Sequence, residues 1–382
     1  MRIVKILCFL LLLAALLCGS AILSLASLFM GKPGAILLIW PAALTILLLA
    51  GTGLFGWFSR PLRLGMTAVL GVCVLIGGSW WVYQAWDDSF RTVKDEVDLW
   101  DYRPFAGKSR LAALAAPSTL KLTTDLPRLD GATALYPLYA AIVQATYPVG
   151  DYDYSSDPVQ CSKTTAAWER LMAGEADAIF VARPSQKQTE AAKARGLELQ
   201  LTPIGREAFV FFVNARNPVN ELSVSQIQDI YSGKLTDWRS VGGEDGTIKA
   251  FQRPEGSGSQ TMLQKTMEGK TLIPAPQADV VQGMGGIIRH TANYKNYRNA
   301  IGYSFLFFAT EMVKNDEIRL LTIDGIAPSR QSIRDKTYPF SADLYAATIK
   351  GHETPQTRAL IEWVLAPQGQ ELIDKTGYVP LN

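Results

Sequence analysis

Three long apolar runs open the chain and constrain its fold more than any other feature. They lie at about residues 6–30, 35–58 and 64–85. Each run exceeds the roughly 18–20 residues that a helix needs to cross a bilayer. The third run ends in aromatic residues that are typical of a membrane interface, namely Trp80, Trp81, Tyr83 and Trp86. The sequence therefore predicts a membrane anchor of three transmembrane helices over residues 1–86.

Positive charges beside these runs indicate the orientation of the anchor. They are Arg2, Lys5, Lys32, Arg60 and Arg63. The connection at 31–34 holds only one of them, so the richer sides belong in the cytoplasm. We therefore expect a cytoplasmic N-terminus and a C-terminal domain outside the cytoplasmic membrane. The alternative is that the first run is a cleaved signal peptide, but its apolar core is long and two further runs follow.

The rest of the chain has the pattern of an α/β protein. Residues 87–117 are charged and then alanine-rich, and we expect a juxtamembrane linker there. From about Ser118, apolar strand segments alternate with amphipathic helical segments, which favours an α/β architecture. A stretch of about 265 residues is large for one compact unit, so we expect two lobes.

Composition excludes several classes of site. The net charge is only +2, which gives no global basic field for nucleic acid. The two histidines, His290 and His352, are far apart, which argues against a histidine-rich metal centre or a Ser-His-Asp triad. Cys161 is the one cysteine outside the apolar runs, and we interpret it as an inert small hydrophobe. No metal and no cofactor are expected.

Three expected helix starts share hydroxyls and small residues. They are DGATA (130–134), SKTT (162–165) and RPEGSGS (253–259). A helix N-terminus carries unpaired N–H groups and a partial positive charge, so it stabilises an anion. One exposed terminus contributes only about 0.3–1 kcal/mol, but three that converge with an arginine fork suit tighter binding. The alternative is that all three are ordinary caps, since Ser and Thr are preferred there.

Seven motifs extend the pattern through nearly all of the C-terminal region. They are DGATALYPLY (130–139), LMAGEADAIFVARP (171–184), FVFFVNARNPVNELSVSQIQDIYSGKLTDW (209–238), RPEGSGSQTM (253–262), AIGYSF (300–305), YPFSADLY (338–345) and GQELIDKTGYVPL (369–381). In this order they resemble the periplasmic phosphate-binding proteins of ABC-type phosphate uptake. The resemblance implies a two-lobed type II periplasmic-binding-protein fold. The three-run anchor lies outside it.

The resemblance also implies lobes and binding residues. Lobe I would hold about 118–206 and 320–382, and lobe II about 207–319, with a hinge that includes strand 207–213 and a return crossing between about 300 and 345. The residues implied for phosphate binding are Thr133, the backbone N–H of Ala134, Thr164 or Thr165, Arg253, Ser257, Gly258 and Ser259.

Three departures from the family pattern lie in the implied site. The family's threonine after Ser-Gly is Ser259 here, which keeps the hydrogen-bond donor. The second loop lacks the family's Ser-Gly-Gly run and has Lys163-Thr164-Thr165 instead, which bears on its backbone geometry. The third departure bears on selectivity: where well-known members carry an aspartate that accepts the proton of phosphate and so rejects sulfate, this chain has Arg183, which is itself a candidate ligand residue. Asp130 and Asp153 are candidates for the missing acceptor, and an exposed turn aspartate is the alternative for each.

These observations predict a membrane-anchored extracytoplasmic solute-binding protein that closes on inorganic phosphate or a similar oxyanion. An ABC permease or another membrane protein is the expected partner. The alternative is a membrane-tethered sensor or a signalling or assembly module with the same fold. We do not expect an enzyme, because no motif places a base beside Ser257 or Ser259. Gln260 also stands near the place where a Walker loop needs lysine.

Overall fold

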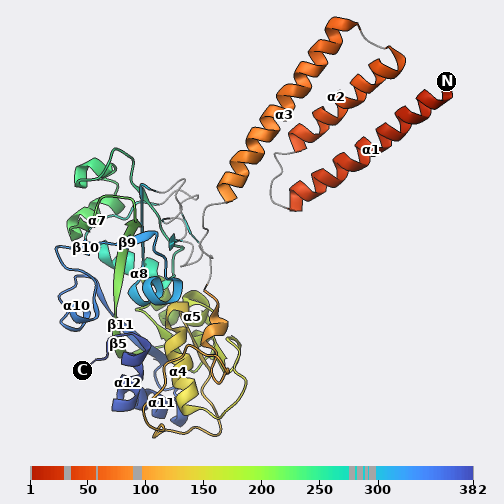
Figure 1. The fold of residues 1–382 in the computed structure, drawn as a ribbon. Coiled ribbons are helices and arrows are strands. Elements are labelled where there is room, and N and C mark those ends of the chain that lie inside the picture. The colour runs from red at the N-terminus through yellow and green to blue at the C-terminus, as the bar shows by residue number, and fades with distance from the viewer. Residues whose placement is uncertain are drawn as a thin grey trace. The chain divides into compact units, whose positions relative to one another are not determined.

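The computed structural model describes residues 2–29, 36–56, 59–88, 97–274, 280–281, 287–288, 291 and 298–381. Two compact units divide the chain, Met1–Arg91 and Thr92–Asn382, and each is described by itself (Figure 1).

The N-terminal unit consists of helices. They are α1 (Arg2–Phe29), α2 (Ile36–Phe55) and α3 (Arg60–Asp88). α1 and α2 pack antiparallel. Lys5 Nζ donates to the Leu54 carbonyl at 3.0 Å near one end of the pair, and Trp40 Nε1 donates to Ser24 Oγ at 3.2 Å near the other. Long apolar helices joined by short connections account for this hairpin.

Among the described residues of this unit, two segments are long and apolar enough to cross a membrane, Arg2–Leu25 and Arg60–Ser79. The apolar segment within α2, Ile39–Phe55, is shorter. The predicted count of three spanning helices is therefore not confirmed, although α1, α2 and α3 each cover most of one predicted run. A first apolar helix of this kind also suits a signal sequence, which was the alternative considered. The predicted hairpin at 31–34 and the side chains of the aromatic cluster lie outside the described residues.

The second unit is built on one long strand, β5 (Leu199–Asn214), which belongs to two halves of a sheet. Its first part, residues 199–208, pairs antiparallel with β11 (Ser341–Ile349). Its second part pairs antiparallel with β8 (Ala300–Phe305) and β9 (Ile318–Leu320). We call the two halves lobe I and lobe II. β5 contains the segment 207–213 that the sequence predicted as a hinge strand, and we call β5 the hinge strand below.

The remaining strands complete the two halves. The order is β2-β3-β1-β4-β11-β5 in lobe I and β5-β8-β7 in lobe II, with a separate β10-β6 pair. Their bounds are β1 (Leu129–Gly131), β2 (Ser155–Ser156), β3 (Val159–Gln160), β4 (Ala178–Val181), β6 (Glu221–Leu222), β7 (Lys249–Ala250) and β10 (Thr322–Ile323). β1 pairs parallel with β3 and β4, so the loops at the carboxyl ends of these strands share one edge.

Helices cover both lobes. In Figure 1, α4, α5, α11 and α12 gather around one half of the domain, and α7 and α10 around the other. The bounds are α4 (Tyr136–Thr146), α5 (Thr164–Met172), α6 (Gln186–Ala194), α7 (Val224–Tyr231), α8 (Gly258–Thr266), α10 (Arg330–Arg334), α11 (Pro355–Leu365) and α12 (Pro367–Thr376). Shorter turns are η2 (Leu99–Tyr102), η3 (Thr133–Leu135), η4 (Trp238–Val241) and η6 (Phe308–Val313).

Local sequence accounts for several of these elements. Ser223 is the N-cap of α7 and forms a capping box with Gln226. Trp168, Tyr231 and Trp238 are all fully buried, so these aromatic side chains pack the core.

Part of the expected linker belongs to this second unit. Residues 97–117 lie along it, with Tyr102 only 3% exposed. The Ala115 N–H donates to Glu371 Oε1 at 3.1 Å, and Arg110 Nη2 donates to the Glu311 carbonyl. The rest of the expected linker, 89–96, lies outside the described residues.

The chain returns from lobe II to lobe I late. β10 still pairs with β6 at Thr322 and Ile323, and the chain rejoins the sheet of lobe I only with β11 at Ser341. The expected lobe boundary near residue 320 precedes this stretch, whereas the return crossing lies within the expected range.

Candidate functional site

The candidate site lies where α5 of lobe I meets α8 of lobe II. Gly258 is the first residue of α8, and a Cβ placed on it would lie 3.4 Å from Thr164 Oγ1. Gly256 has a φ of +82°, and a Cβ there would lie 3.5 Å from Thr165 Oγ1. A buried hydrogen bond from Gln188 Nε2 to the Gly256 carbonyl, 3.1 Å long, joins the lobes. The two helix N-termini therefore face each other at close range.

A small cavity lies between these loops. Its volume is about 10 Å³, roughly the room that one water molecule needs. Lobe I contributes Ala134, Thr164 and Ala182 to its lining, and lobe II contributes Gly258. Glu207 of the hinge strand also lines it. The loops that the resemblance singles out thus converge on one cavity.

Arg253 lies just before α8 and has unused donors in the described part of the chain. Its backbone N–H donates to Gln260 Oε1 and to the Tyr303 hydroxyl, each at 2.9 Å, which fixes the loop to the helix and to β8. Its Nε and Nη1 atoms are buried and have no hydrogen-bond partner among the described residues. Burial lowers the pKa of Arg253 to about 10. A buried guanidinium without a counter-ion is destabilising, and a bound anion would offset that penalty.

The serines of the same loop have different environments. Ser257 is the N-cap of α8, and its Oγ accepts a hydrogen bond from the Gln260 N–H at 3.4 Å. Ser259 is fully buried, and its hydroxyl has no partner in the described part of the chain. Unused donors on Arg253 and on Ser259 thus belong to residues at or just before a helix N-terminus, where an anion is stabilised. Neither of these two residues is among those that line the small cavity.

The first loop of lobe I, residues 130–134, leads into η3 without a side-chain cap. Thr133 begins η3, and the preceding Ala132 makes no side-chain cap. Ala134 is buried in the wall of the cavity. Cys161, which contacts the Thr133 side chain, has a pKa raised to about 11 mainly by burial. Its thiol therefore stays protonated near neutral pH, as expected for an inert cysteine.

The second loop has a strained backbone. Lys163 is the N-cap residue of α5, with φ 73° and ψ 161° and no side-chain cap bond. This conformation is almost confined to glycine. The loop therefore keeps a glycine-like geometry at the position where the resembling family has a glycine run.

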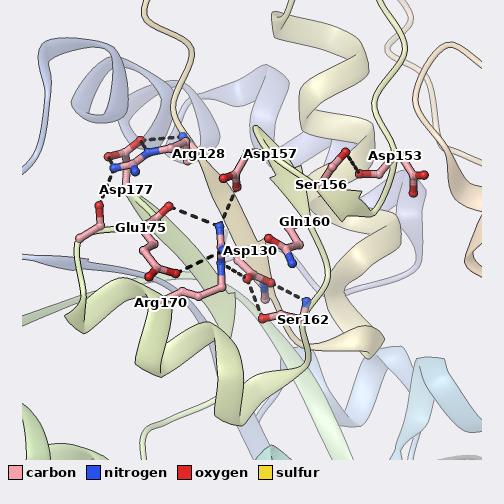
Figure 2. Close-up of polar contacts among 12 residues, drawn as sticks. Arg128, Asp130, Asp153, Ser156, Asp157, Gln160, Ser162, Arg170, Glu175 and Asp177 are labelled. Carbon is pink, nitrogen blue, oxygen red and sulfur yellow. Dashed lines mark hydrogen bonds and ion pairs between the residues drawn. The ribbon is translucent and has the colours of Figure 1, made fainter.

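Asp130 contacts the second loop through Ser162, as Figure 2 shows. It is fully buried, and its Oδ1 accepts from the Ser162 backbone N–H at 2.8 Å. Its Oδ2 accepts from Ser162 Oγ at 2.7 Å and lies 3.0 Å from Arg170 Nε. Because both oxygens are engaged, the geometry favours a role for Asp130 in positioning Ser162 ahead of α5 rather than in accepting a proton from a ligand.

The other charged candidates lie in ordinary structural settings. Asp153 Oδ1 accepts from the Ser155 N–H at 3.0 Å, as in a turn. Arg183 is exposed at the end of β4, and its Nη2 lies 3.5 Å from the Tyr345 hydroxyl. Burial alone would raise the pKa of Asp177, but hydrogen bonds from Arg128 outweigh it and hold that pKa below its usual range (Figure 2).

The structure thus brings Ala134, Thr164 and Gly258 to one cavity. Sequence reasoning missed Glu207, which lines the same cavity and is only 3% exposed. The sequence feature that could have identified it is a charged residue at the start of the apolar strand segment EAFVFFVN. The binding role of each implied residue stays a prediction.

The hinge strand shared by two α/β lobes and the facing loops define a type II periplasmic-binding-protein fold. A family model described as a PBP superfamily domain matches residues 123–368, more than half of the chain. The chain belongs to the PBP superfamily.

Two relatives carry the name phosphate-binding protein PstS. The protein of Bacillus subtilis is 25% identical over 197 residues, which is 50% of this chain and 62% of the relative. The protein of Borreliella burgdorferi is 21% identical over 187 residues, which is 47% of this chain and 66% of the relative. Both alignments therefore span less than two thirds of the relative's own length.

Solved structures share the fold. A Clostridium perfringens protein, assigned as a phosphate ABC transporter substrate-binding protein and solved with bound phosphate, has a TM-score of 0.53 and 22% identity. The match covers 69% of this chain and 100% of that one. An ABC-type phosphate transport receptor from Vibrio cholerae has a TM-score of 0.50 and 20% identity, over 68% and 99% of the two chains.

Proposed function

We propose that this chain binds inorganic phosphate or a similar oxyanion between its two lobes. The observation that carries the proposal is that, among the described residues, neither the buried Nε and Nη1 of Arg253 nor the buried Ser259 hydroxyl at the start of α8 has a hydrogen-bond partner. Relatives named phosphate-binding proteins support phosphate as the ligand. The ligand contacts would come from Thr133, Ala134, Thr164 or Thr165, Arg253, Ser257, Gly258 and Ser259.

Binding would couple to movement of the lobes. The cavity is now too small for an oxyanion, and Gln188 holds Gly256 across the interface. An anion therefore enters an opened form, and the lobes then close on it around β5. Arg253 and the N-termini of α5 and α8 contribute stabilising charge only when closure brings them together.

We further propose that the N-terminal helices anchor this domain to the cytoplasmic membrane, with the domain on the outer side. Two spanning-length apolar segments and the adjacent cations support the anchor. The protein would deliver phosphate to an ABC permease for uptake. The anchor also suits the alternative of a tethered sensor, because apolar helices offer a surface for a membrane partner.

Phosphate titration of the full chain in detergent micelles tests the binding proposal. We expect saturable binding to wild type and at least a ~30-fold weaker affinity for Arg253→Ala, because truncating a buried charged partner costs about 2–5 kcal/mol. Calorimetry measures both affinities.

The matched control is Arg298→Ala. Arg298 is an exposed arginine of lobe II paired with Glu244 at 2.9 Å, so its loss should leave the phosphate affinity unchanged. Equal affinities for wild type and Arg253→Ala, or no binding by wild type, would contradict the proposal.

A further inference from the structure

The segment that follows the N-terminal helices in the chain is fixed along one face of α12. We call residues 97–117 the strap. Alternate residues of its last part hydrogen-bond to α12 residues that lie three and four positions apart. Lys375 Nζ donates to the Ala113 carbonyl at 3.2 Å, the Ala115 N–H donates to Glu371 Oε1 at 3.1 Å, and Gln368 Nε2 donates to the Pro117 carbonyl at 2.9 Å. Residues spaced in this way share one helix face, so the strap runs antiparallel along α12.

The strap therefore moves with lobe I. α12 is held to the first part of β5, where Gln370 Nε2 donates to the Ile204 carbonyl at 3.0 Å. Nearer the start of the strap, the Phe105 N–H donates to Gln144 Oε1 of α4 at 3.0 Å. α4 follows β1 of the same lobe. Both ends of the strap are thus attached to lobe I.

Arg110, in the middle of the strap, reaches lobe II. Its Nη2 donates to the Glu311 carbonyl at 3.1 Å. Glu311 belongs to η6, which connects β8 to β9. Because both of these strands pair with the second part of β5, η6 moves with lobe II. One hydrogen bond from the strap therefore spans the boundary between the lobes.

The other contacts of Arg110 lie within the strap. Its backbone N–H donates to the Asp101 carbonyl at 2.7 Å, and its Nη1 lies 3.7 Å from Asp101 Oδ2. The guanidinium also lies over the Tyr102 ring, 4.9 Å from the ring centroid. Asp101 and Tyr102 form part of η2, the first described element after α3. Arg110 therefore links η2 to lobe II.

A cavity of about 400 Å³ lies where the strap meets the hinge. Tyr102 and Arg110 of the strap line it together with Thr310 and Glu311 of η6. Glu207 of β5 lines this cavity and also the small cavity between the lobes. A rotation about β5 therefore affects both cavities, and the larger one gives η6 room to move relative to the strap.

The structure has the lobes in contact, since Gln188 of lobe I donates to the Gly256 carbonyl of lobe II. Opening them for an anion moves η6 relative to α12, because the two elements belong to different lobes. A hydrogen bond of 3.1 Å is lost when its atoms separate beyond about 3.5 Å. A small rotation is therefore enough to part Arg110 from Glu311.

We propose that the strap transmits closure of the lobes to the part of the chain that leads from the N-terminal helices. In the closed form, Arg110 holds η2 to lobe II. In the open form, Arg110 keeps its partners within the strap, and η2 is released from lobe II. The inference rests on the proposed function, because anion binding is the cause of closure. A contact made in one form only also favours that form, so its loss weakens anion binding.

Hydrogen–deuterium exchange of the full chain in detergent micelles, with and without inorganic phosphate, tests this inference. In wild type, we expect phosphate to slow amide exchange within residues 97–112 by at least ~3-fold, because closure restores the Arg110 contact. Exchange within 113–117 should be unchanged, because these residues stay on α12 in both forms. Arg110→Ala should abolish the phosphate effect within 97–112. It should also bind phosphate ~2–5-fold more weakly, as expected for one partly exposed charged contact.

Arg103→Ala is the matched control. Arg103 is an arginine of the same strap, but it lies over the Trp100 ring at 4.1 Å and 3.5 Å from Asp151 of lobe I. This variant should keep the wild-type exchange response and the wild-type phosphate affinity.

Two results would overturn the inference and leave the proposed function intact. One is phosphate binding by wild type without slower exchange within 97–112, and the other is a wild-type exchange response in Arg110→Ala. The wild-type comparison decides even if Arg110→Ala fails to fold. Absence of phosphate binding by wild type would reject the proposed function, and this inference with it.

Discussion

At the residue scale, the two serines at the start of α8 differ in their hydrogen bonding. Ser257 caps the helix, whereas the Ser259 hydroxyl is buried without a partner among the described residues. Ser257→Ala should lower the free energy of unfolding by ~1 kcal/mol, the usual effect of losing a cap. Ser259→Ala should leave stability unchanged or higher without phosphate, because it removes an unsatisfied buried group.

Phosphate affinity should distinguish the same two variants. Ser259→Ala loses a donor to the anion, so we expect ~5–10-fold weaker phosphate binding from a hydrogen bond of about 1–1.5 kcal/mol. Thermal unfolding of the full chain with and without phosphate measures both effects. The prediction would be contradicted if Ser259→Ala lowered the stability of the phosphate-free protein and left its phosphate affinity unchanged. The Ser259 hydroxyl would then stabilise the fold rather than bind the anion.

At the element scale, the start of α5 keeps a strained geometry. Lys163 adopts φ 73° and ψ 161°, which costs a non-glycine residue about 1–3 kcal/mol. Lys163→Gly should raise the free energy of unfolding by ~1 kcal/mol after the entropy of glycine is subtracted. Lys193→Gly, on the exposed face of α6, should instead lower it by about 1 kcal/mol. Denaturant-induced unfolding of the full chain measures the free energy of unfolding of both variants. Equal destabilisation by the two substitutions would contradict the claim that the Lys163 backbone is strained.

The sequence predicts a structural feature well when the interacting residues are close together in the chain, and poorly when they are far apart. The cap at Ser257 and the capping box of α7 each depend on residues three apart, so such features have a local sequence signal. Ordinary caps were considered as the alternative for the loop that holds Ser257. The role of Asp130 was not predicted, because its partner Ser162 is 32 residues away. Glu207 was missed for the same reason, since the N–H of Phe307 that it accepts lies 100 residues further along. The sequence motifs located the loops that hold Ala134, Thr164 and Gly258. Only the folded chain shows that Glu207 lines the same cavity as these residues.

At the scale of the whole molecule, one strand couples the two lobes. β5 pairs with β11 in lobe I and with β8 in lobe II, so a small rotation within it moves α5 relative to α8. Glu207 lies at that junction, where β5 passes from β11 to β8. A membrane anchor would keep this motion close to a permease or another membrane partner.

The central claim is that an oxyanion binds between the lobes at the start of α8. Crystals of the full chain grown with arsenate, a phosphate analogue with anomalous scattering, test it most directly. The account predicts one strong anomalous peak within hydrogen-bond distance of the Arg253 guanidinium, the Ser259 hydroxyl and the Thr164 side chain. A peak elsewhere, or none at saturating arsenate, would contradict it.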